Sequence, residues 1–329
     1  MVQANSITDK SSATVVSPAG RAIARSARRR RGSLRKRLEL LLLLGPALVL
    51  FVGFVLLPIV VAVYYSLYRW DGFGPLTDFV GLHNYKRALS DSVFQHAILH
   101  NGIVALLSLV LQIPLGIALA LMLNRRLRGR AFLRLIVFAP YVVSEAIASV
   151  IWLLILQPDG FVDKVIRSAG LGSVVHLWLA NKTLVLYTLF VVLTWKYIGF
   201  GIILLLAGLQ GIPMELREAA ALDGATPWQA TRSVVLPLLG PTIRIWIFLS
   251  MIGSLQLFDI VWIMTQGGPA DASTTMSTYM FDKGFTASSY GYGSAVTVIL
   301  FIICFAFSLL YQRFALRRDT QGALTRMAG

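Results

Sequence analysis

Long apolar runs separated by shorter polar connections dominate the pattern of this chain. Six such runs lie near 40–67, 97–123, 132–156, 184–208, 243–265 and 293–314. Each has the roughly 20 residues that an α-helix needs to cross about 30 Å of hydrocarbon. The pattern predicts an all-α integral membrane protein with about six transmembrane helices. A membrane domain at 38–315 would lie between a basic tail at 1–37 and a second tail at 316–329.

Composition excludes an ordinary soluble protein. Hydrophobic residues form 57% of the chain, charged residues form 14%, and the mean hydropathy is +0.72, whereas soluble domains carry roughly 25% charge. The single cysteine, Cys304, lies in the last apolar run and cannot form an intrachain disulfide. The apolar stretch at 38–67 is about twice as long as the hydrophobic region of a signal peptide, so we expect an uncleaved first span.

Positive charge is distributed unevenly along the chain. The formal net charge is +15, and ten of the 30 Lys and Arg residues precede Leu38. If the N-terminus is cytoplasmic, the inner segments hold 22 Lys and Arg residues and the outer segments hold 7. Cytoplasmic loops carry such an excess, so both termini are predicted to be cytoplasmic. Because the basic tail adjoins an apolar span, we expect it to contact lipid headgroups rather than nucleic acid.

The connection at 209–242, between the fourth and fifth runs, carries signals for two short helices. Pro213 suits the first position of a helix, and Asp223-Gly224 predicts its end because glycine readily adopts the left-handed conformation. The segment from Thr226 to Gln229 predicts the start of a second helix with a capping box, and Leu236-Pro237 predicts its end. Two capped helices exceed what a simple connector needs.

The same connection carries a resemblance to a known family. The stretch Glu218-Ala-Ala-Ala-Leu-Asp223-Gly224-Ala225, followed by Leu236-Pro237, resembles the EAA motif of the inner-membrane permeases of binding-protein-dependent ABC importers. The resemblance covers most of 40–315. It departs from the family pattern at Thr231 and Val234, where an aromatic residue and isoleucine are common. The segment Leu206–Pro213 is also similar to that family, and the pattern of Phe258–Pro269 and Tyr290–Ala295 is most similar to its maltose/lactose/glycerol-phosphate branch.

The resemblance implies a type I ABC importer permease fold in the bacterial inner membrane. It implies import of a sugar into the cytoplasm by alternating access, with 209–242 as a cytoplasmic coupling-helix hairpin. The implied partners are a second homologous permease, two ATP-binding cassette subunits and an extracytoplasmic sugar-binding protein. ATP and Mg would bind those cassette subunits, so we expect no cofactor and no enzymatic activity in this chain, which contains no P-loop motif. The implied coupling residues are Glu218, Ala219, Ala220, Asp223, Gly224, Leu236 and Pro237.

Two ionisable residues lie deep within the predicted spans. Since charges are costly there, one hypothesis is that Glu145 and Lys196 pair or line an aqueous cavity, with Asp259 as the second candidate partner of Lys196. The alternative is that Lys196 extends to the interface or that each group contacts backbone alone. Sugar sites combine aromatic faces with hydrogen-bonding groups. The candidate pathway residues, each of which has packing as its alternative role, are Glu145, Trp195, Lys196, Tyr197, Gly199, Gln256, Phe258 and Asp259.

Two other function classes compete with the importer. An ion-coupled secondary transporter predicts coupling acids at mid-membrane; Glu145 is the one candidate, and the capped connection would have no role. An intramembrane enzyme needs a nucleophile–base pair or metal ligands at membrane depth, and neither G-x-S-x-G nor H-E-x-x-H occurs in the sequence. His96 and His100 have the spacing of a metal pair, but two histidines alone make a poor zinc site, so no metal is expected.

Overall fold

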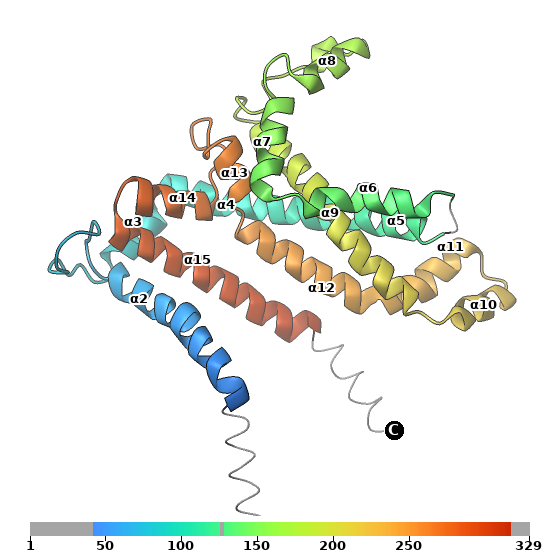
Figure 1. Ribbon diagram of the computed structural model, residues 1–329, viewed down its shortest axis with the longest axis horizontal. Coiled ribbons are helices and arrows are strands. Elements are labelled where there is room, and N and C mark those ends of the chain that lie inside the picture. The colour runs from blue at the N-terminus through green and yellow to red at the C-terminus, as the bar shows by residue number, and fades with distance from the viewer. Residues whose placement is uncertain (1–41, 126–127, 317–329) are drawn as a thin grey trace, which may run out of the picture. The chain divides into compact units, whose positions relative to one another are not determined.

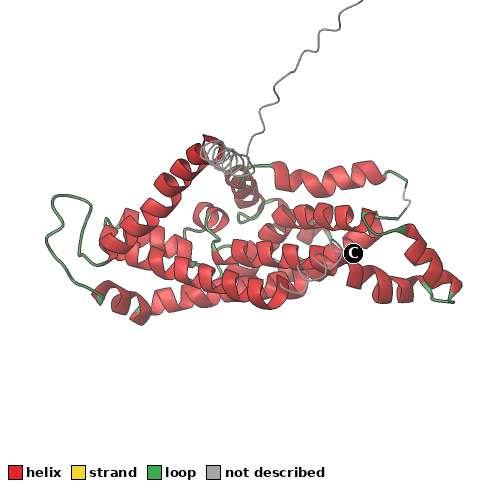
Figure 2. Cartoon of the chain, turned by 90° about the horizontal axis from the view of Figure 1, so that it is seen from below, coloured by secondary structure: helices red, strands yellow, loops and turns green. Residues whose placement is uncertain are grey.

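The computed structural model describes residues 42–125 and 128–316, so the predicted tail at 1–37 and most of that at 316–329 lie outside the described residues. The chain divides into two compact units between Val61 and Ala62. The described residues are predominantly helical (Figures 1 and 2), and extended pairing among them is limited to an isolated bridge between Tyr68 and Phe79.

Within the described residues, five helical segments are long and apolar enough to cross a membrane, and a bent helix pair supplies a sixth. The prediction of about six transmembrane helices is therefore confirmed. The five continuous segments are Leu42–Ser66, Ser92–Leu123, Val185–Gln210, Pro227–Leu255 and Tyr290–Ala315. Their main helices are α2 (Leu57–Ser66), α4 (Ser92–Leu107), α5 (Ile113–Leu123), α9 (Val185–Gln210), α12 (Leu236–Leu255) and α15 (Tyr290–Tyr311).

Shorter helices lie at the two ends of the second unit. Figure 1 places α10 (Met214–Leu222) and α11 (Pro227–Ala230) at the same end as the arginine-rich connection between α5 and α6 (Arg130–Val142). This is the arrangement that the predicted topology requires. The connections predicted to be outer contain α3 (His83–Ser90), α8 (Phe161–Ser168) and α14 (Met276–Phe281), whereas α13 (Asp259–Met264) lies within the predicted fifth span.

Helix α9 is the most buried of the candidate spans and packs against α5, α6 and α12. Gly116 of α5 and Gly201 of α9 leave the space that the indole of Trp246 fills, because a Cβ at either glycine would overlap that ring. Trp246 is accordingly buried. Close approach through small residues is how helices associate where lipid removes the hydrophobic driving force.

The third predicted span, 132–156, is broken rather than continuous. It consists of α6 (Arg130–Val142) and α7 (Glu145–Ile155), which meet at an angle of 101°. Val143 and Ser144 are extended at the break, and the Ser144 hydroxyl accepts a hydrogen bond of 3.3 Å from the Ile147 amide as the N-cap of α7. Hydropathy alone does not reveal this break, because apolar residues lie on both sides of it.

The fifth predicted span, 243–265, is displaced toward the N-terminus. The helix that starts at Pro227 continues through a π-helical turn at Thr231–Val235 into α12, so Leu236-Pro237 does not end it. Proline lacks an amide donor and crowds the preceding turn, and a π-helical turn is one known accommodation within a helix. The predicted span also crosses a break, because α12 ends at Leu255 and α13 begins at Asp259.

Candidate translocation pocket

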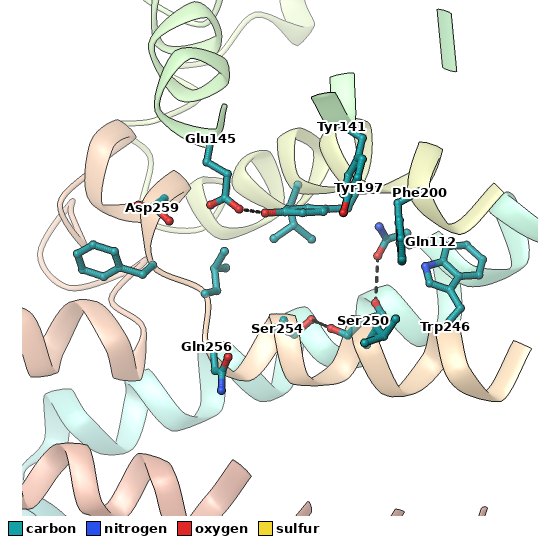
Figure 3. A pocket seen from close by; sticks show the side chains of 15 residues that line it. Gln112, Tyr141, Glu145, Tyr197, Phe200, Trp246, Ser250, Ser254, Gln256 and Asp259 are labelled. Carbon is teal, nitrogen blue, oxygen red and sulfur yellow. Dashed lines mark hydrogen bonds between the residues drawn. The ribbon is translucent and has the colours of Figure 1, made fainter. Parts of the chain in front are cut away.

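A half-open cavity of about 390 Å³ lies where the two breaks face α9. We call it the central pocket (Figure 3). Its aromatic walls are Tyr141, Tyr197, Phe200, Trp246 and Phe258. Its polar lining comprises Gln112, Glu145, Ser250, Ser254, Gln256 and Asp259.

The aromatic wall is formed where α6 meets α9. The ring of Tyr141 stacks on Phe200 with 5.0 Å between centroids, and it meets Tyr197 edge to face at 6.2 Å. Tyr197 and Phe200 are three residues apart on α9 and therefore project from one side of that helix. These rings present a broad apolar face beside polar groups, which suits the apolar face of a sugar ring.

The polar lining comes from the facing helices. The Ser250 hydroxyl donates a hydrogen bond to Gln112 Oε1 at 3.4 Å, and the Ser254 hydroxyl donates to the Ser250 carbonyl at 2.9 Å. Glu145 begins α7, and its Oε1 accepts a hydrogen bond from the Tyr197 hydroxyl. Asp259 begins α13 and is exposed at the pocket. The Glu145 and Asp259 carboxyl groups are close enough to interact electrostatically.

Lys196 contacts backbone rather than Glu145. Its Nζ donates to the carbonyls of Pro140 and Tyr141 at 3.0 and 2.9 Å, and also to that of Val143. The side chain is 3% exposed. Among the described residues no ion pair joins Lys196 to Glu145 or Asp259. Predicted pairing is therefore wrong for this conformation, because the last carbonyls of α6 have no intrahelical donors and take the ammonium instead.

A buried side-chain amide stabilises the second break, which lies between α12 and α13. Asn101 of α4 is fully buried; its Nδ2 donates to the Ser254 carbonyl at 2.7 Å, and its Oδ1 accepts from the Met276 amide at 2.9 Å. One side chain thus binds the end of α12 and the start of α14. The Thr275 hydroxyl adds a 2.7 Å hydrogen bond to the Leu257 carbonyl within the break.

The structure separates the predicted pathway residues into two groups. Glu145, Tyr197, Gln256, Phe258 and Asp259 line the central pocket, whereas Trp195, Lys196 and Gly199 do not. The indole of Trp195 packs edge to face on Trp152 at 5.4 Å. A Cβ at Gly199 would overlap the Val137 carbonyl of α6, so this glycine serves close helix approach.

Sequence reasoning missed the remaining lining residues. The serines Ser250 and Ser254 are four residues apart on one face of α12, which is a detectable signal for a polar stripe within a span. Gln112 is another polar group inside an apolar run. No comparable signal marks the aromatic members, since isolated rings in apolar spans are ordinary packing residues. The members missed were Gln112, Tyr141, Leu193, Phe200, Trp246, Leu249, Ser250, Gly253, Ser254 and Leu257.

The connection at 209–242 folds as two capped helices that meet at Gly224. The Gly224 amide bonds the Ala221 carbonyl at 3.1 Å and the Ala225 amide bonds the Ala220 carbonyl at 2.9 Å, which is a Schellman end. Gly224 has φ +81 and open space around its α-carbon, so its backbone conformation and not crowding requires glycine. These predicted features are confirmed; Pro213, however, caps α10 rather than occupying its first turn.

The second helix of the connection begins as predicted. Thr226 and Gln229 form the capping box, and Pro227 occupies the first helical position. Thr231, which departs from the family pattern, donates its hydroxyl to the Pro227 carbonyl at 2.8 Å. Large apolar side chains are nevertheless left exposed on the two helices: Leu222 is 89% exposed and Trp228 65%. Exposed apolar side chains of this size favour a protein contact over a solvated connector.

The two histidines considered for a metal each contact backbone. The Nδ1 of His96 lies 2.7 Å from the Ser92 carbonyl, and the Nδ1 of His100 lies 2.8 Å from the Thr274 carbonyl. Within 42–125 and 128–316, no cluster of three or more His, Cys, Asp or Glu side chains is arranged to hold a metal ion.

Comparison with known proteins identifies the family. Residues 112–320 match the family described as the binding-protein-dependent transport system inner membrane component. The trehalose/maltose transport system permease protein MalF of Thermococcus litoralis is 35% identical over 84% of this chain and 94% of its own length. The sn-glycerol-3-phosphate transport system permease protein UgpA of Agrobacterium fabrum is 31% identical over 85% of this chain and 96% of its own length.

A solved structure shares the fold. A chain of the bacterial alginate ABC transporter, in complex with an alginate pentasaccharide-bound periplasmic protein, superposes with a TM-score of 0.76 at 23% identity, covering 87% of this chain and 96% of that chain. The broken spans, the central pocket and the capped connection thus occur in a fold known from an ABC transporter. The chain belongs to the family of inner-membrane components of binding-protein-dependent transport systems.

Proposed function

We propose that this chain is the sugar-translocating permease subunit of an ATP-driven importer in the bacterial cytoplasmic membrane, with both termini in the cytoplasm. The central pocket is the observation that carries this proposal. It combines stacked aromatic rings with convergent hydrogen-bonding groups inside the candidate spans. That combination is what a sugar needs in order to leave water, because its hydroxyls require partners and its ring faces are apolar.

Alternating access would use the two breaks as the movable parts of the pocket. Glu145 and Asp259 begin the helices that follow the breaks, so a change in either helix angle would move a polar group of the lining. Discontinuous helices whose ends lie at a mid-membrane site are common in transporters. The sugar would enter from an extracytoplasmic sugar-binding protein and leave toward the cytoplasm.

The capped connection at 209–242 would transmit ATP hydrolysis to the spans. Leu222 and Trp228 are exposed, and the helix that carries Trp228 runs without interruption into α12. A displacement of this connection by an ATP-binding cassette subunit would therefore reach the pocket side of α12. The complete importer would contain two such subunits, which bind ATP and Mg, and a second homologous permease.

The test is co-purification and uptake with two variants of Gly224. At φ +81, valine is strained and asparagine is tolerated, because β-branched residues rarely adopt positive φ. We expect Gly224→Val to lose the ATPase subunit and ATP-driven sugar uptake, and Gly224→Asn to retain both. Sugar uptake that needs an ion gradient and no ATPase subunit would favour the secondary transporter instead.

A further inference from the structure

The central pocket has an acidic lining without a basic counterpart. Among the described residues that line it, Glu145 and Asp259 are the carboxylic acids, and none is Lys, Arg or His. The other polar groups are hydroxyls and amides, such as Ser250 and Gln112, which can donate or accept hydrogen bonds without charge. The electrostatic character of the lining therefore comes from two carboxyl groups.

The Lys196 ammonium lies 5.6 and 5.7 Å from the centroids of the Tyr141 and Tyr197 rings of the lining, but it is not available to a ligand. Lys196 directs its ammonium into three backbone carbonyls at the end of α6, and its side chain is 3% exposed. Its attraction to Glu145 acts at a distance, without an ion pair. An ammonium has three donors, and all three have partners here, so an incoming anion would find no free donor on it.

The two carboxyl groups act on the same space. Glu145 comes from the break between α6 and α7 and Asp259 from the break between α12 and α13, and both line the central pocket, with Glu145 joined to Tyr197 (Figure 3). A ligand between the two breaks would meet both groups together with the adjoining rings.

This chemistry discriminates between uncharged and anionic sugars. Sugar hydroxyls donate hydrogen bonds, and a carboxylate accepts several of them through two oxygens. A uronate or sugar phosphate would bring a further negative charge into a partly dehydrated site whose described lining includes no cationic side chain, and repulsion is stronger there than in water. The named relatives include a trehalose/maltose and a glycerol-3-phosphate permease, so family membership leaves the charge of the substrate open.

We propose that the central pocket selects uncharged sugars and excludes anionic ones through Glu145 and Asp259. This proposal rests on the proposed import function and adds the charge class of the substrate. Selection would occur within this chain, in addition to any selection by a binding protein. The carboxyl groups would hold sugar hydroxyls, and the Tyr141 and Tyr197 rings would cover an apolar face of the sugar.

The test uses the complete membrane complex in lipid nanodiscs without its separate binding protein. Saturation-transfer NMR would measure binding of the methyl D-glucopyranoside, D-galactopyranoside and D-mannopyranoside, and of the three matching methyl pyranosiduronates. Each pair differs by one carboxylate. For wild type we expect at least one neutral pyranoside to bind, and its uronate to bind at least about tenfold more weakly.

The variants assign the discrimination to the two carboxyl groups. In Glu145→Gln combined with Asp259→Asn, the preference should fall below about threefold. The single variant Asp259→Asn, at an exposed site, should reduce it in part and guards against misfolding of the double variant. Asp159→Asn removes a carboxylate that is 72% exposed and paired with Arg167, and it should leave the preference unchanged.

Failure of this proposal and failure of the import function give different results. A uronate that binds as tightly as its neutral partner, or a preference that survives in both carboxyl variants, overturns the charge assignment. ATP-driven uptake by the same preparation would then still stand. Absence of binding by every pyranoside, together with absence of ATP-driven uptake, overturns both.

Discussion

Two breaks in the membrane helices border the central pocket, and they are stabilised by different chemistry. At the break between α6 and α7, the ammonium of Lys196 bonds carbonyls that end α6. At the break between α12 and α13, the neutral amide of Asn101 bonds the Ser254 carbonyl and the Met276 amide. Both side chains come from an unbroken neighbouring helix and both are buried. Each break is therefore bonded by a buried polar residue of another span, and Thr275 adds a hydrogen bond at the second.

The two breaks show how backbone N–H and C=O groups without a partner in their own helix are hydrogen-bonded inside a membrane. At the first break, Lys196 contacts only carbonyls, which suits a residue with three donors, while the Ser144 hydroxyl accepts from an amide of α7. At the second break, Asn101 contacts a carbonyl at the end of α12 and the amide that starts α14, which suits a side chain with both a donor and an acceptor. A charged group costs more to bury than an amide, and its loss should consequently have the larger effect.

The largest effect is expected for Lys196→Met. The side chain keeps its length, but the carbonyls of Pro140, Tyr141 and Val143 lose their donor. Unpaired buried acceptors cost about 1–3 kcal/mol each where water cannot replace the donor, so we expect the free energy of unfolding to fall by about 3 kcal/mol and transport to be lost. Thermal unfolding in detergent and ATP-driven uptake measure this. Lys164→Met, at an exposed lysine of α8, is the matched control, and equal behaviour of the two variants would refute the role of Lys196.

A smaller loss is expected for Asn101→Leu. The substitution removes a donor and an acceptor from a site of 0% exposure, which should lower the free energy of unfolding by about 2 kcal/mol. Gln95→Leu on the same helix removes a bond at an exposed position and should change it by about 0.5 kcal/mol or less. If water replaces the Asn101 contacts, Asn101→Leu and Gln95→Leu would lower the free energy of unfolding by the same amount, which would contradict the prediction.

Gly199→Ala tests whether Lys196 must be brought close to α6. The added methyl would overlap the Val137 carbonyl, so α9 would have to move away from the end of α6. Overpacking of this kind costs about 1–3 kcal/mol. Gly102→Ala, at a helical glycine with open space around it, should be neutral or stabilising because alanine favours helix. Unfolding midpoints of the two alanine variants decide the point, and a neutral Gly199→Ala would contradict the close approach.

The smallest effect concerns the coupling between the breaks. Lys196 and Asn101 share no hydrogen-bond partner, so their losses should add to within about 0.5 kcal/mol in the double variant. A double-mutant cycle on the free energy of unfolding measures the coupling. A larger coupling energy would mean that the two breaks form one cooperative unit rather than two separately held ones.

The capped connection could be predicted from sequence because its signals are local. The breaks could not, because they depend on contacts between residues that are far apart in the chain. Gly224 and the Thr226–Gln229 box act within a few residues of themselves, so their pattern is visible in the chain. The break at Val143-Ser144 lies between two apolar stretches that together read as one span, and its stabilising donor is Lys196, more than fifty residues away. Hydropathy measures apolar length and not the direction of a helix, so the predicted span at 132–156 was right in content and wrong in continuity.

The sequence predicted five members of the pocket lining, namely Glu145, Tyr197, Gln256, Phe258 and Asp259. Glu145 and Asp259 stood out because ionisable groups in apolar runs need an explanation. Lys196 stood out for the same reason, but its ammonium donates to backbone carbonyls and does not line the pocket. Trp246 and Tyr141 give no sign of their role in the sequence, since their place in the lining depends on how α12 and α6 pack against α9.

The most direct test of the central claim is a cryo-electron microscopy map of the complete importer with a transported sugar bound. The account predicts sugar density in the central pocket, within hydrogen-bonding distance of Glu145 or Asp259 and against the Tyr141 or Tyr197 ring, with Lys196 still bonded to the end of α6. Sugar density elsewhere in the spans, or a straight continuous helix across Val143-Ser144 in the loaded state, would contradict it.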